Sequence, residues 1–393
     1  MQKIKFILIV FLIWRLFLFL PLFLGYLLLA SRSGYEYTNI WKFISPYYPV
    51  SSFFLYPWAN FDGVHYLRIA GDGYTNNGGF FPFFPLIIHV ASLAFGGSSV
   101  FGSVEFFSAL ILSNIFFLLA FIVFYFLIRF DFSEKIAVSS IVFLLLFPTS
   151  FFFGSIYTES LFLLLSLLCF FHARRKEWLQ AGILGSLLTA TRIVGISIFP
   201  VILYEFIVAE KVQLAFRQKK DRLKLFIKSL PLYFIPLGLL SYMWFNVLKW
   251  GNAFYFLKAQ GTLMNGRSTD SIILFPQTLV RYAKILPTVS FYQYEWWIAL
   301  LEISTFIIVS ILLFVAWKKG IRFSYILFSL FCFLIPVSSG TFTGLPRYSV
   351  VLFPIFIALA LINNKKIQIA YAIISTVLLF ILLMLFSRGY FVA

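Results

Sequence analysis

Long apolar runs separated by short polar or basic stretches dominate the chain. The first run, residues 6–30, follows Lys3 and Lys5 and is longer than the core of a signal peptide, so we predict a retained membrane-spanning helix. The run 178–208 is too long for one span, and we divide it near Arg192 into two short helices. Further spans are predicted over residues 104–129, 136–153, 157–173, 229–248, 297–317, 322–338, 347–362 and 367–386.

The run 81–97 is also apolar, but Pro82, Pro85 and His89 interrupt it. Because cytoplasmic loops carry an excess of Lys and Arg, charge decides whether this run crosses the membrane. The basic clusters are Lys3/Lys5, Arg174-Arg175-Lys176, Lys211 to Lys228, Lys318-Lys319 with Arg322, and Lys365-Lys366. All of them lie in the cytoplasm if 81–97 is re-entrant or interfacial. We therefore predict an all-α polytopic membrane protein of about eleven spans, with the N-terminus inside and the C-terminus outside.

This topology makes residues 1–393 a single integral membrane domain. Its first external loop, 31–103, contains the re-entrant segment, and its second covers residues 249–296. Proline-interrupted backbone at membrane depth must be shielded by protein or line a cavity, so 81–97 is expected to wall a site.

Composition supports a membrane protein. Hydrophobic residues make up 62% of the chain and charged residues 11%, whereas soluble domains average about 25% charged. The net charge of +17 does not indicate nucleic acid as a partner, because the basic residues fall in predicted cytoplasmic loops rather than on a soluble domain. Membrane lipid is the expected surrounding.

Charged residues gather after the first span, in "PWANFDGVHYLRIAGDGY". A helix over 61–70 would place Asp62 and His65 one turn apart, with Arg68 a further turn on. The glycines on either side of Asp72 are expected to end this helix and leave Asp72 in a turn. Asp62 either contributes to a site or caps the helix, and the sequence alone leaves both open.

Three other stretches send charged groups to the same outer face. Glu159 opens an apolar helix, Arg192 lies between two short helices, and Arg347 with Tyr348 follows Pro346. The alternatives are that Glu159 caps its helix, that Arg192 reaches the interface, and that Arg347 anchors a lipid headgroup. Ionisable residues at membrane depth usually face a cavity and are functional, so these residues and those around Asp62 are candidate substrate ligands.

Exterior chemistry limits the substrates. No nucleotide-sugar pool exists outside the cell, so an activated sugar must be carried by a lipid phosphate. An aspartate can accept the proton of an attacking hydroxyl, and arginines can neutralise a departing phosphate. The chain shows no phosphate-binding glycine loop, nucleophile elbow or zinc motif, so no cofactor is expected. If Asp62, Asp72 and Glu159 converge, their carboxylates could bind a divalent metal, so metal dependence is left open.

The chain resembles the GT-C superfamily of membrane glycosyltransferases, and most closely the GPI mannosyltransferase II (PIG-V) family with its prokaryotic relatives. The resembling pieces are, in the family's order, "FDGVHYLRIAGDGY", "GFFPFFPLI", "SIYTESLFLLLSLLCFF", "LLTATRIVG" and "LPRYSVVLFP". The resemblance implies a GT-C fold, Asp62 as catalytic base, and a polyprenyl- or dolichyl-phosphate mannose donor. Phe61 stands where the family usually has Trp. The composition is typical of a prokaryotic protein, so we expect a plasma membrane enzyme with its site on the external face.

The leading hypothesis is an inverting mannosyltransferase. Alternatives are transfer of a different sugar, and a transporter or flippase of lipid-linked sugars. Transporters often contain repeated broken helices, and the sequence shows a single split segment near Arg192 without a matching partner. The acceptor, a glycan, lipid or protein, and the oligomeric state are left open.

Overall fold

The computed structural model describes residues 2–34, 40–44, 48, 51–97, 101–212, 219–263, 268 and 271–393. Within these ranges all regular structure is helical, and an isolated parallel bridge joins Ile273 to Ser339. The middle of the predicted basic loop and parts of both predicted external loops lie outside the described residues.

Helices occupy much of the predicted apolar runs and also form outside them, with 3₁₀ turns (η) between some of them. They are α1 (Gln2–Phe17), α2 (Phe19–Leu28), η2 (Ile40–Lys42), α3 (Ser51–Phe54), η3 (Tyr56–Ala59), α4 (Asp62–Asp72), α5 (Phe83–Ala94), α6 (Ser103–Ile128), α7 (Glu134–Leu145), η4 (Ser150–Gly154), α8 (Glu159–Arg174), α9 (Trp178–Thr189), η5 (Ile193–Ser197), α10 (Ile198–Ala209), α12 (Lys219–Ser229), η6 (Leu230–Phe234), α13 (Leu237–Trp250), α14 (Tyr255–Leu263), α15 (Phe275–Thr288), α16 (Tyr294–Lys318), α17 (Phe323–Val337), α18 (Leu345–Ser349), α19 (Pro354–Ala360) and α20 (Lys365–Ser387).

Four stretches among the described residues are long and apolar enough to cross a membrane. They are Lys3–Leu28, which joins α1 to α2, and the helices α6, α16 and α20. The pair Arg222–Phe234 and Leu237–Trp250, bent by 44°, forms a fifth if it is one span. The eleven predicted spans are therefore not confirmed. The reason is length: α7 and α9 have 12 residues each, which is about 18 Å of helix against about 30 Å of hydrocarbon.

Two predicted spans differ from the structure in a second way. The run 347–362 is not one helix but the two short helices α18 and α19, because Pro354 begins a new helix. Every residue of α19 is buried inside the protein. The run 136–153 ends as a helix at Leu145 and continues into the buried turn η4. By contrast, the predicted division of 178–208 at Arg192 is confirmed, since α9 and η5 lie on either side of it.

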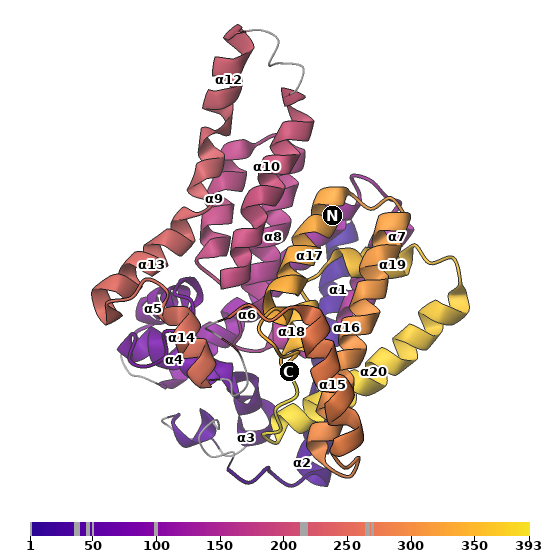
Figure 1. Ribbon diagram of the computed structural model, residues 1–393. Helices are drawn as coiled ribbons and strands as arrows, with labels where there is room; N and C mark the ends of the chain where they lie inside the picture. Colours follow the sequence, from indigo (N-terminus) through magenta and orange to yellow (C-terminus); the bar gives the residue numbers. More distant parts are fainter. Residues whose placement is uncertain are drawn as a thin grey trace.

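Helix α8 is the central element of the core. Most of its residues are buried, and it packs against α6, α9 and α10. Figure 1 shows α8, α9 and α10 side by side, with α12 and the end of α10 reaching beyond the rest of the molecule. Since α8 begins at Glu159, the first turn of this largely buried helix carries an acidic side chain into the middle of the protein.

Helices α4 and α5 pack against each other and against α6. Helix α4 begins at Asp62, near the predicted start, but it continues through Gly71 and ends at Asp72. Gly73 is its C-cap, and its φ of 76° suits glycine. Asp72 therefore lies in the last turn of the helix rather than in a turn after it. Helix α5 covers most of the run 81–97, and its 12 residues make about 18 Å of helix, so re-entrance remains a prediction.

Candidate active site

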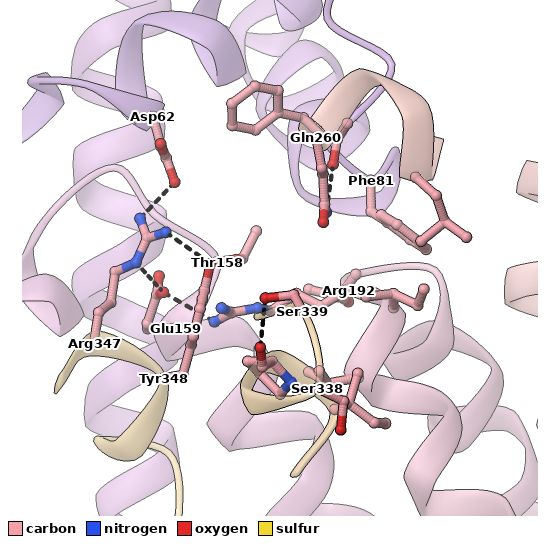
Figure 2. A pocket seen from close by; sticks show the side chains of 18 of the residues that line it. Asp62, Phe81, Thr158, Glu159, Arg192, Gln260, Ser338, Ser339, Arg347 and Tyr348 are labelled. Atoms are coloured by element: carbon pink, nitrogen blue, oxygen red, sulfur yellow. Dashed lines mark hydrogen bonds and ion pairs between the residues drawn. The ribbon is translucent and has the colours of Figure 1, made fainter. Parts of the chain in front are cut away.

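A cavity of about 740 Å³ opens where the start of α4, the start of α8, η5 and α18 meet. Figure 2 shows the charged side chains on one side of it and Gln260 and Phe81 on another. Six of the eight predicted site residues line this cavity: Asp62, His65, Glu159, Arg192, Arg347 and Tyr348. Four separate segments of the chain thus bring their scarce charges to one place.

Asp62 and Arg347 form the first contact of the site. Nη1 of Arg347 donates to Oδ2 of Asp62 at 2.5 Å, and no described residue engages the other carboxylate oxygen. The Arg347 side chain is only 4% exposed, whereas the Asp62 side chain is 17% exposed. The carboxylate is therefore the more accessible partner of this pair. Neither Asp62 nor Glu159 caps its helix, because each is the first helical residue rather than the N-cap.

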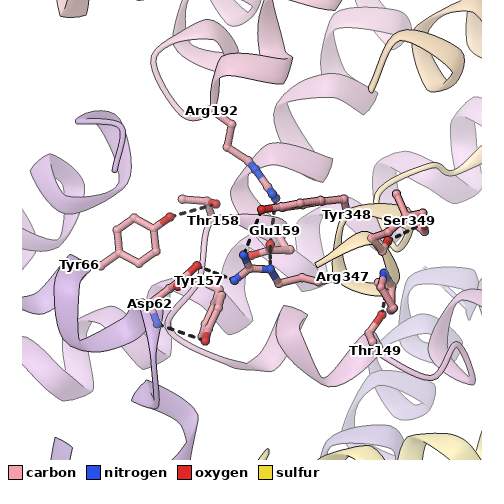
Figure 3. Close-up of polar contacts among 12 residues, drawn as sticks. Asp62, Tyr66, Thr149, Tyr157, Thr158, Glu159, Arg192, Arg347, Tyr348 and Ser349 are labelled. Atoms are coloured by element: carbon pink, nitrogen blue, oxygen red, sulfur yellow. Dashed lines mark hydrogen bonds and ion pairs between the residues drawn. The ribbon is translucent and has the colours of Figure 1, made fainter. Parts of the chain in front are cut away.

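Glu159, deeper in the protein than Asp62, contacts both arginines of the site. Its Oε1 accepts a hydrogen bond from Nη1 of Arg192 at 2.9 Å and lies 3.6 Å from Nε of Arg347. Asp62, Arg347, Glu159 and Arg192 thus form a continuous row, which we call the charged quartet (Figure 3). Two carboxylates balance two guanidiniums, as burial requires, because an unpaired buried charge is costly. Glu159 is 1% exposed.

Two polar atoms of the quartet are left without a hydrogen bond among the described residues. They are Oε2 of Glu159 and Nε of Arg347, both buried. Buried polar atoms are normally satisfied, so unsatisfied ones beside a cavity point to a polar ligand. The quartet therefore has spare hydrogen-bonding capacity.

Aromatic rings hold the two guanidiniums. The Tyr348 ring lies 5.0 Å from Cζ of Arg192 and 5.2 Å from Cζ of Arg347. Tyr157 lies 5.3 Å from Cζ of Arg347 on another side. Cation–π contacts of this kind stabilise a desolvated cation and restrict its orientation. The arginines are thus oriented before any ligand arrives.

His65 lies one turn after Asp62 and faces the cavity. Its ring stacks on Phe80, with centroids 4.7 Å apart and planes 18° apart. Burial, the largest cause, lowers the pKa of His65 below 6.5; Asp62 opposes this effect and Arg68 adds to it. The imidazole is therefore neutral at pH 7 and offers one donor and one acceptor to a ligand.

Arg68 and Asp72 do not line the cavity. Arg68 places its Cζ 5.6 Å from the Phe101 ring, and Asp72 is exposed. Each helical residue turns by about 100°, so Arg68 lies about 240° around α4 from Asp62 and points elsewhere. Asp72 lies at the other end of α4, about 15 Å along the helix axis from Asp62, so it does not converge with Asp62 and Glu159. Within the described part of the chain, no group of three or more His, Cys, Asp or Glu residues is placed to hold a metal ion.

The cavity also has neutral polar walls that sequence reasoning missed. These residues are Thr158, Gln260, Ser268, Ser271, Ser338 and Ser339. Serine, threonine and glutamine are common throughout proteins, so no pattern in one sequence distinguishes these residues from others of the same type. Phe391, near the end of the chain, also lines the cavity and was not predicted from the sequence.

The solved structures that align with this chain are of one archaeal enzyme. The chain aligns with the apo oligosaccharyltransferase of Archaeoglobus fulgidus at a TM-score of 0.44 and 13% identity, covering 86% of this chain and 52% of that one. The complex of the same enzyme, AglB, with an inhibitory peptide and a dolichol-phosphate gives a TM-score of 0.41 and 14% identity, covering 85% and 52%. The chain thus spans about half the length of that protein. Among curated proteins, no sequence matches.

A family model gives the sequence-level result. The mannosyltransferase (PIG-V) model matches residues 43–250, which is more than half of the chain. The match includes Asp62, Glu159 and Arg192, three of the four members of the charged quartet. It agrees with the resemblance carried by the motifs around those residues, and the protein belongs to the mannosyltransferase (PIG-V) family.

Proposed function

We propose that this membrane glycosyltransferase moves a mannosyl group from a polyprenyl- or dolichyl-phosphate donor to a hydroxyl group of a glycan, lipid or protein, with inversion at the anomeric carbon. The observation that carries the proposal is the charged quartet, which brings an accessible carboxylate and two oriented guanidiniums to one cavity wall. The reaction needs a group that accepts the proton of the acceptor hydroxyl and groups that stabilise the departing phosphate. The carboxylate can meet the first need and the guanidiniums the second.

Asp62 acts as the general base. The acceptor oxygen attacks the anomeric carbon opposite the phosphate, the bond from that carbon to the phosphate oxygen breaks, and the phosphate keeps the electron pair. The acceptor proton passes to Asp62, whose second carboxylate oxygen is not engaged by Arg347. A single displacement of this kind inverts the anomeric centre.

Arg192 and Arg347 bind the phosphate. A guanidinium presents a planar fork that matches phosphate oxygens and stays charged at any working pH. The quartet is neutral before reaction. During transfer the phosphate gains one negative charge while Asp62 loses one by protonation, so the net charge of the cavity does not change. A low-dielectric site favours such balanced steps, because a net buried charge is costly.

The isoprenoid tail fits the apolar side of the cavity. Phe331, Leu334 and Ile335 of α17 line it together with Ile193 and Val194 of η5. Ile335 is 39% exposed on the protein surface. In a bilayer this surface faces hydrocarbon, so a lipid tail can leave the cavity without crossing a polar wall.

A transfer assay with the protein in nanodiscs tests the proposal. We expect mannose to be transferred from polyprenyl-phosphate mannose and not from GDP-mannose, and the product linkage, read by NMR, to be inverted. EDTA should leave the rate unchanged, because guanidiniums already neutralise Asp62 and Glu159. Transfer from GDP-mannose would contradict the lipid donor. Loss of activity in EDTA, restored by manganese, would make Asp62 a metal ligand instead of a base.

The external location of the site is a separate prediction, for a prokaryotic plasma membrane. Cysteine at Phe95, a position 77% exposed beyond α5, should react with a membrane-impermeant maleimide in intact cells. Cysteine at the exposed Lys319 should react only after permeabilisation, because its basic cluster is cytoplasmic. The native Cys169 and Cys332 are buried and are replaced in the background. Protection of position 95 would show that 81–97 crosses the membrane.

A further inference from the structure

We propose that the segment at the end of α20, residues 386–391, positions Asp62 and so forms part of the active site. This C-terminal segment lies outside the residues 43–250 that the family model matches. The inference rests on the proposed role of Asp62 as the base. It is carried by an unusual backbone conformation beside Asp62 and by the contacts that hold it.

Phe61, the residue before Asp62, has φ of 59° and ψ of −112°. This pair of angles is the mirror image of an extended conformation, which a Cβ atom disfavours and only glycine adopts freely. A phenylalanine stays in it only where the surroundings hold it there, and such residues are concentrated at functional sites. The backbone conformation at Phe61 sets the direction in which α4 begins, and therefore where the Asp62 carboxylate lies.

The C-terminal segment supplies the contacts that hold this conformation. The Phe61 ring packs against Phe386, with centroids 5.6 Å apart, and edge-on against Phe391, at 5.7 Å. Nδ2 of Asn60 donates to the carbonyl oxygen of Phe386 at 3.1 Å. The residues immediately before Asp62 are thus bound by both backbone and side chains of the segment.

Tyr157, next to the quartet, fixes the same backbone from the other side. Its hydroxyl donates to the carbonyl oxygen of Asn60 at 2.8 Å and accepts from the backbone N–H of Asp62 at 3.3 Å. The Tyr157 ring lies 4.9 Å from Phe152 and 6.2 Å from Phe386. The backbone at Asp62 is therefore held on one side by the turn that precedes α8 and on the other by the end of α20.

The C-terminal segment is itself tied to two other elements. Tyr294 of α16 donates from its hydroxyl to the carbonyl oxygen of Phe391 at 2.5 Å. After α2, the N–H of Arg32 donates to the carbonyl oxygen of Arg388 at 3.0 Å, and Nε of Arg388 donates to the carbonyl oxygen of Leu29 at 2.9 Å. Figure 1 places the C-terminal end of the chain near α18, the helix that carries Arg347. These hydrogen bonds fix the position of the segment that contacts Phe61.

Phe391 is the residue best suited to test this role, because it contacts Phe61 and is only partly buried. Its loss should let Phe61 relax toward an ordinary conformation and turn the Asp62 carboxylate away from the acceptor. We expect Phe391→Ala to lower kcat about tenfold, within the range that misplacement of a catalytic group costs, with the donor KM changed less than twofold. Phe391→Leu, which keeps apolar bulk, should recover most of kcat. Phe380→Ala is the matched control: it removes a partly buried phenylalanine from α20 that packs on Phe17 and does not line the cavity.

Amide hydrogen exchange gives a readout that does not depend on activity. Exchange over residues 56–66 should be faster in Phe391→Ala than in the wild type, and unchanged in Phe380→Ala. A tenfold fall in kcat without faster exchange would make Phe391 a substrate contact and overturn the positioning role, as would unchanged kcat. If wild-type protein transfers no sugar from lipid donors, the proposed function fails, whereas faster exchange in Phe391→Ala would still support the positioning of Asp62 by the C-terminal segment.

Discussion

Replacing Asp62 with asparagine is expected to lower kcat/KM for sugar transfer by about 10²–10⁴, the range for a lost general base. Asparagine has nearly the same shape, and its side-chain oxygen can still accept the hydrogen bond from Arg347, so the fold of the site should survive. It cannot take the acceptor proton. Donor binding should persist, because the arginines that hold the phosphate are untouched. Initial rates and donor affinity measured on the same nanodisc preparation separate the two effects.

Asp72→Asn is the matched control for this experiment. It makes the same chemical change on the same helix, at an exposed position that does not line the cavity. Its rate should equal that of the wild type. If Asp62→Asn keeps half or more of the wild-type rate, Asp62 is not the base, and Glu159 becomes the candidate.

The charged residues of the site could be predicted from sequence because charge is scarce in this chain. In so apolar a protein, a charged side chain in the interior needs a partner or a ligand, so Glu159, Arg192 and Arg347 each indicate one. Their pairing could not be predicted, since it depends on how α8, η5 and α18 pack. Arg68 and Asp72 were linked to Asp62 by closeness in sequence alone. The helix turns Arg68 away from the cavity, and Asp72 lies about 15 Å along the helix axis from Asp62. Glycine did not end the helix where expected.

The number of spans was harder to predict for a related reason. An apolar run indicates surroundings of low polarity but does not say whether they are lipid or protein. The residues of α19 belong to such a run, yet they are buried against other helices in the core. Likewise, the hydroxyl and amide groups on the cavity wall have no distinctive spacing. The contact between Phe61 and Phe391 joins residues that lie far apart in the sequence.

Replacing Glu159 with glutamine should give the largest loss of stability, because it leaves Arg192 and Arg347 with an excess positive charge in a buried site. Breaking a buried ion pair by removing one partner costs about 3–5 kcal/mol. The expected observation is a clearly lower thermal unfolding temperature in detergent. Glu295→Gln is the control, since its pair with Arg32 is exposed and surface pairs contribute about 0–1 kcal/mol.

Charge balance explains how this loss can be repaired, and the repair distinguishes electrostatics from packing. In the double variant Glu159→Gln/Arg192→Gln only Asp62 and Arg347 remain charged in the quartet, so the unfolding temperature should recover while activity stays low, because one phosphate ligand is gone. Polyprenyl phosphate should stabilise Glu159→Gln more than the wild type, since its anion takes the place of the missing carboxylate. If the double variant unfolds at the same lowered temperature as the single one, the effect of Glu159 comes from shape rather than charge. The arginines would then not be a prepared phosphate site.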